Sequence, residues 1–91
     1  MALSSAGGGG TTIAKTGSSA AVMYTVPAGK TFEGHMWNNS STGPGYINGT
    51  QLSWPYHSSY FQHAYLPITL NEGDVIKADN SGTTMLVGVE K

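Results

Sequence analysis

The sequence predicts an all-β protein, an antiparallel jelly-roll-like sandwich preceded by a flexible, glycine-rich N-terminal arm. Short runs rich in β-branched and aromatic residues recur at a spacing of about 8–12 residues, as in sandwiches and barrels. Clusters of Gly, Asn, Ser and Pro separate these runs. No stretch combines a helical spacing of apolar residues with capping residues, so helices are not expected.

Residues 1–10 form the expected arm, because four consecutive glycines at 7–10 lose much conformational entropy when they become ordered. The sandwich domain is expected over residues 11–91. Its first strand is the weakly alternating run 11–15, and its second is the β-rich run 20–27, which stops at Pro27.

The run 30–38 alternates, with Phe32, Gly34 and Met36 on one face and Thr31, Glu33, His35 and Trp37 on the other. The polar run 38–45 reads as a loop. Residues 46–54 contain Asn48-Gly49, the pair preferred in type I′ hairpins.

Pro67 interrupts the run 64–70, which predicts an edge or bulged strand. Residues 74–79 and 83–90 are expected to form a terminal hairpin around the turn 80–82. A faint repeat aligns 26–34 with 70–78, matching Gly29 to Gly73. It indicates either two similar units packed face to face or only the common composition of β-hairpins.

Composition points to self-association. A chain of 91 residues has a thin core, and with no cysteine it has no disulfide to strengthen it. It has four Lys and Arg together, five Asp and Glu, and no arginine, which argues against nucleic-acid binding. No apolar run is long enough to span a membrane.

No catalytic signature is present, so the protein is not expected to be an enzyme or to hold a cofactor. The run "PAGKT" at 27–31 ends like a P-loop, but Tyr24 stands where that motif needs glycine. No G-x-S-x-G motif occurs, and most of the acids fall in turns. His57 and His63 lack a nearby third ligand, so no metal site is expected.

The segment 53–67, "SWPYHSSYFQHAYLP", holds five aromatic residues, two histidines and no charge. Aromatic side chains are enriched in interfaces, and the segment lacks the alternation that one small core could absorb. A cap on the core and a sugar-binding platform remain alternatives. The predicted interface consists of Trp54, Tyr56, His57, Tyr60, Phe61, His63 and Tyr65.

The segments "VPAGKTFEGHMWN" and "PITLNEGDVIKADNSGTTMLVGVE" resemble small all-β structural proteins of tailed-bacteriophage virions. The resemblance implies a homotrimer on the capsid surface, a decoration or cement protein that bridges subunits of the major capsid protein or another virion protein. It brings no catalytic residues with it. The alternative is a receptor-binding fibre tip or a lectin-like carbohydrate-binding module.

Overall fold

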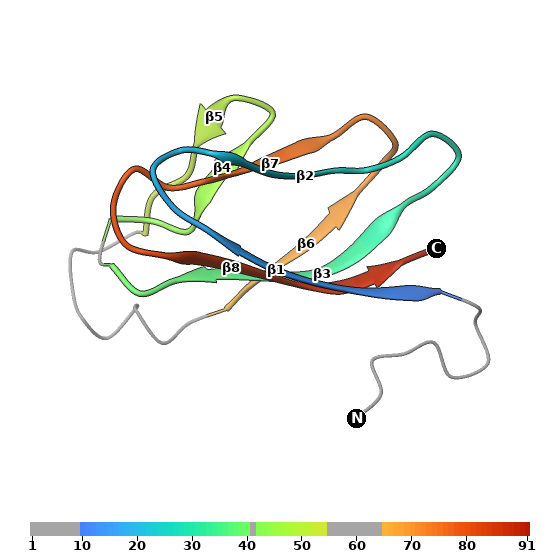
Figure 1. The fold of residues 1–91 in the computed structure, drawn as a ribbon, viewed down its shortest axis with the longest axis horizontal. Helices are drawn as coiled ribbons and strands as arrows, with labels where there is room; N and C mark the ends of the chain where they lie inside the picture. Colours follow the sequence, from blue (N-terminus) through green and yellow to red (C-terminus); the bar gives the residue numbers. More distant parts are fainter. Residues whose placement is uncertain (1–9, 41, 55–64) are drawn as a thin grey trace.

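The computed structural model describes residues 10–40, 42–54 and 65–91. In them the chain forms two antiparallel sheets of four strands each, packed face to face (Figure 1). None of these residues belongs to a helix. The predicted all-β antiparallel sandwich is therefore confirmed. The expected arm, apart from Gly10, lies outside the described residues, and β1 begins at Thr11, the first residue of the expected domain.

The first sheet, called sheet A, has the strand order β1-β8-β3-β6, and the second, sheet B, has the order β2-β7-β4-β5. The strands of sheet A are β1 Thr11–Gly17, β8 Thr84–Glu90, β3 Phe32–Asn38 and β6 Leu66–Leu70. Those of sheet B are β2 Val22–Thr25, β7 Val75–Ala78, β4 Gly45–Ile47 and β5 Thr50–Gln51.

The core lies between the sheets and follows the alternation of β3. Phe32 and Met36 are fully buried, and Glu33 and His35 are exposed, which confirms the predicted division of this run into two faces. The Phe32 ring lies 5.3 Å from that of Tyr24, which joins sheet A to sheet B across the core. The buried cluster consists of Tyr24, Val26, Phe32, Met36, Leu70, Ile76 and Leu86.

Two local predictions hold at single residues. Asn48 and Gly49 both have positive φ, at 50° and 82°, between β4 and β5, as a type I′ turn requires. Pro67 lies in β6, an edge strand of sheet A. Proline is tolerated in edge strands, because no neighbouring strand on the open side needs its missing N–H as a hydrogen-bond donor.

The predicted terminal hairpin is wrong. β7 pairs with β2 and β4 in sheet B, whereas β8 pairs with β1 and β3 in sheet A. Residues 79–83 carry the chain from one sheet to the other (Figure 1). Each strand thereby gains two neighbours in place of the single partner that a hairpin at the end of the chain would provide.

Buried polar side chains hold this crossing in place. The Thr84 hydroxyl donates to the Pro44 carbonyl at 2.7 Å and accepts from the Asn38 amide and the Asp79 N–H. The Asp79 carboxylate accepts from the Ser81 N–H and hydroxyl. Within the described part of the chain, no buried side-chain nitrogen or oxygen lacks a hydrogen bond. The hydrogen bonds at the crossing between the sheets therefore account for the burial of these polar side chains.

Asp74 joins two turns of the sandwich. Its carboxylate accepts from the Asn48 side-chain amide at 3.0 Å and from the Asn71 N–H at 2.8 Å. The Asn48 side-chain oxygen in turn accepts from the Val75 N–H. The bonds from Asn48 and then Asn71 lower the pKa of Asp74 below its usual 3.8, because they stabilise the charged form.

We expect the substitution Asp74→Asn to change how the free energy of unfolding depends on pH in the acid range. A lowered pKa in the folded state means that the carboxylate stabilises the fold above about pH 4 and loses this contribution as the pH falls further. The wild type should therefore be the more stable at neutral pH, and the difference should shrink toward zero in acid. Thermal melts across this range measure it. A difference that does not change with pH would show that the carboxylate charge is not the cause.

Tyr24 also links the two sheets by a hydrogen bond. Its hydroxyl donates to the Glu90 carboxylate on β8 at 2.7 Å. Burial is the main cause that raises the pKa of the Tyr24 phenol above its usual 10.0, and the bond to Glu90 and the negative charge of that residue raise it further. The neutral phenol is therefore the form that the folded protein requires.

We expect Tyr24→Phe to cost about 1 kcal/mol of stability near neutral pH, the usual net worth of one hydrogen bond. Because the folded state holds the phenolic proton more tightly, the contribution of Tyr24 is complete below about pH 10 and is lost as the pH rises beyond that value. Urea unfolding at neutral and alkaline pH should show the wild type losing this increment while the variant does not. A variant with the same alkaline loss would place its origin elsewhere.

Candidate interaction face

The outer face of sheet A, called here the A face, carries mostly uncharged side chains, many of them apolar. Side chains that oppose each other in an antiparallel pair point to the same side of the sheet. The register therefore places these side chains opposite the core: Thr12, Ala14 and Thr16 from β1, Met85, Val87 and Val89 from β8, Glu33, His35 and Trp37 from β3, and Tyr65, Pro67 and Thr69 at β6. Of these, Val89 is buried. Glu33 is the one acidic or basic side chain (Asp, Glu, Lys or Arg) in this set.

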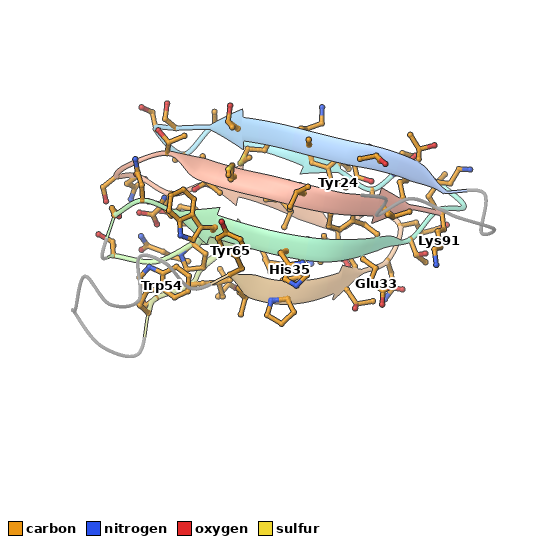
Figure 2. The ribbon with its side chains drawn as sticks, turned by 90° about the horizontal axis from the view of Figure 1, so that it is seen from below. Tyr24, Glu33, His35, Trp54, Tyr65 and Lys91 are labelled. Carbon is orange, nitrogen blue, oxygen red and sulfur yellow. The ribbon has the colours of Figure 1, made fainter. Side chains whose placement is uncertain are left out.

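One corner of the A face carries a bulky aromatic pair. Trp37 and Tyr65 contact edge to face, with ring centroids 6.0 Å apart and planes at 72°. Tyr65 is 60% exposed, and Trp37 is half-buried. Figure 2 looks onto this face and shows Tyr65, His35 and Glu33 along it. A large apolar surface is thus held in a fixed arrangement at the protein surface.

The β1–β8 half of the A face carries shorter side chains than the β3–β6 half. Small side chains on β1, namely Thr12, Ala14 and Thr16, leave the half-buried Met85 and Val87 of β8 uncovered. A hollow lies there, and its wall is mostly apolar. It is lined by Ala14, Lys15, Thr16, Tyr65, Met85, Leu86 and Val87.

The outer face of sheet B is different in chemistry. The Lys77 ammonium lies 5.1 Å from the centre of the Tyr46 ring and covers it by a cation–π contact. Gln51, opposite Tyr46, donates to the Asp79 carboxylate. These groups satisfy one another within the chain, which makes sheet B the weaker candidate for an apolar contact.

Two of the seven predicted interface residues can be placed. Trp54 is only 8% exposed, and its indole N–H donates to the Ser40 carbonyl within the same chain. Tyr65 is exposed and belongs to the A face. The structure therefore does not bring these two together as one patch. The others, Tyr56, His57, Tyr60, Phe61 and His63, lie outside the described residues, and their interface role stays a prediction.

Sequence reasoning did not select Trp37, Met85 and Val87 as contact residues. The signal was present for Trp37, because the alternation of 30–38 already placed it opposite Phe32 and Met36. A tryptophan on the polar face of an alternating strand indicates a contact beyond the core. Met85 and Val87 gave no such signal, since the apolar run 85–87 does not show which side is buried.

The described residues contain no group of three or more His, Cys, Asp or Glu side chains that could hold a metal ion. They also contain no helix long and apolar enough to cross a membrane. Comparison of the chain with protein-family models, with curated proteins and with solved structures finds no match.

Proposed function

We propose that the protein is a structural component of a virion, a capsid decoration or cement protein that acts as a homotrimer and bridges subunits of the shell. The observation that carries this proposal is the A face, an apolar sheet surface with a fixed aromatic pair and a single acidic residue. Exposed apolar patches of this kind mark contacts with other proteins. The resemblance of 26–38 and 67–90 to virion proteins supplies the biological setting.

We propose further that the sandwich is a jelly roll. The support is its pairing pattern, in which β1 pairs with β8, β2 with β7, β3 with β6 and β4 with β5. Such a chain is one long antiparallel ribbon, folded over so that β3 meets β8 and β4 meets β7. Double-sheet jelly rolls of eight strands are common in viral capsids and also in lectins.

The test of the virion assignment is the particle itself. Virions should be purified from the phage that carries the gene, analysed by mass spectrometry and imaged by electron cryomicroscopy. We expect many copies of the chain per particle, in three-fold density on the outside of the shell. Particles that lack the chain would refute the assignment, and a location at the fibre tip would replace it by the receptor-binding alternative.

The carbohydrate-binding alternative has one feature in its favour, the exposed Tyr65 beside Trp37. A sugar platform requires an aromatic ring face open to solvent, with hydrogen-bonding groups beside it. A screen of the purified protein on a glycan array, followed by titration with any bound saccharide monitored by tryptophan fluorescence, distinguishes a carbohydrate-binding module from a decoration protein. Saturable binding of one saccharide that Tyr65→Ala abolishes would favour the lectin-like module over the decoration protein.

A further inference from the structure

We infer that copies of this chain pack together through the A face, with the β3–β6 half of one copy against the β1–β8 half of the next, about a symmetry axis parallel to the strands. The inference rests on the proposed function in one respect, the self-association of the chain. It adds the surface, the matching halves and the direction of the axis.

The two halves of the A face complement each other in height. One row across the sheet reads Thr16, Met85, Trp37 and then Tyr65, from β1 to β6. Its β3–β6 end carries the two large rings, and its β1–β8 end supplies most of the hollow, which the Tyr65 ring borders on the other side. The face therefore contains both a projection and a recess of its own, which is the requirement for a surface that binds copies of itself.

The order of the row decides the direction of the axis. Sheets that pack face to face lie about 10 Å apart, which leaves room for one layer of interdigitating side chains. An axis parallel to the strands sets the β3–β6 half of one copy against the β1–β8 half of the next and keeps each row level, so Tyr65 approaches Thr16 of the next copy and Trp37 approaches Met85. An axis across the strands would place β3 over β3 and stack the large halves on each other.

Charge agrees with the same arrangement. Glu33 lies in the row of Thr12, Val89 and Thr69, at the other end of β3 from Trp37. An axis parallel to the strands places it opposite Val89 and Thr12 of the next copy, at the border of the contact. No two like charges of the face are then opposed, and Lys15, which borders the hollow, is the one charged side chain beside the aromatic contact.

The size of the face sets the expected affinity. About a dozen side chains, each covering roughly 33 Å² of sheet, give a flat contact area on the order of 400 Å² per copy. The two sides together bury about 800 Å², which is below the roughly 1,200–2,000 Å² of stable specific interfaces and indicates a weak contact. We therefore expect dissociation constants in the micromolar range, so the native mass must be followed over a concentration series.

The experiment exchanges the two residues that face each other across the contact. Tyr65→Thr should leave the recess empty, and Thr16→Tyr should oppose two tyrosines. Each change alone should weaken association by roughly 30-fold or more, the effect of losing a hot-spot residue. The double variant Thr16→Tyr/Tyr65→Thr restores one large residue opposite one small residue, and its dissociation constant should return to near that of the wild type. Sedimentation equilibrium measures all four proteins.

Both positions are exposed, so the folded state should survive, which near-ultraviolet circular dichroism and thermal melts verify. The control is Val22→Arg, at a position that is 62% exposed in sheet B. It should leave the mass unchanged, whereas Ala14→Arg, at the hollow, should produce monomers. A wild type that stays monomeric up to millimolar concentration would overturn the inference. So would assembly that survives both single changes, or a double variant weaker than either.

These outcomes separate the inference from the proposed function. A monomer that still occurs in virions would leave the virion assignment standing without this contact. An assembly that depends on Thr16 and Tyr65, in a protein that virions lack, would confirm the contact and refute the assignment.

Discussion

Phe32→Ala should destabilise the protein more than any other single truncation of its core. The side chain is fully buried, packs on Tyr24 and lies over the glycines of the two neighbouring central strands. Replacing a buried Phe by Ala costs about 3–5 kcal/mol, because transfer free energy is lost and a cavity remains. A domain of this size has only about 5–14 kcal/mol in total.

Guanidinium unfolding followed by circular dichroism measures the effect of Phe32→Ala. At about 4 °C per kcal/mol or more, we also expect the melting temperature to fall by at least about 12 °C. The matched control is Glu33→Ala, the next residue of the same strand, which is exposed on the other face. It should change stability by no more than about 0.5 kcal/mol. Equal effects of the two substitutions would contradict the placement of the core.

Gly88→Ala is the second substitution for which we expect a large effect, although it adds only one carbon. Gly88 of β8 lies opposite Gly34 of β3 in the centre of sheet A. A Cβ on Gly88 would lie 2.6 Å from the Gly34 Cα and 2.6 Å from the Phe32 Cζ, and it would also meet the Glu33 carbonyl oxygen. Because two of these three atoms belong to backbone, the strands themselves must move apart. We expect a cost of about 3 kcal/mol, at the upper end for overpacking.

The ring and backbone parts of this clash can be separated. Phe32→Leu removes the ring tip that a new Cβ would strike, but it leaves the backbone of β3 in place. In a double-mutant cycle, Gly88→Ala should therefore cost less in the Phe32→Leu background than in the wild type, and still cost measurably. Urea unfolding of the four proteins gives the coupling. Complete rescue would mean that the strands tolerate the added carbon, and no rescue would mean that the ring is not in its way.

These two residues also mark what the sequence can and cannot predict. The alternation around Phe32 divided the side chains of β3 correctly between its two faces, because successive side chains of a strand point to opposite sides. The contact of Phe32 with Gly88 could not be predicted, since it depends on the register of two strands that are distant in the chain. Asn48-Gly49 was predictable for the opposite reason, as its conformation is decided by two adjacent residues.

The A face also has parts that the sequence could predict and parts that it could not. The aromatic content of 53–67 drew attention to one segment, but its two described members go different ways, Trp54 into its own chain and Tyr65 to the surface. Trp37 becomes the neighbour of Tyr65 only because β3 and β6 pair. The composition of the segment therefore could not predict the ring pair of Trp37 and Tyr65, which depends on the pairing of two strands, and the interface itself stays a prediction.

The position of β8 has a consequence for how the protein is made. β8 is the last of the described strands to leave the ribosome, yet it lies in the interior of sheet A and supplies the partner for both β1 and β3. At about 5–20 residues per second, β1 waits several seconds for that partner. During this time the apolar side of β3 has no completed sheet around it, and the open edges of β1 and β3 can pair with those of another nascent chain. Closely spaced ribosomes on one message should therefore raise the yield of misassembled protein, and slower initiation should lower it.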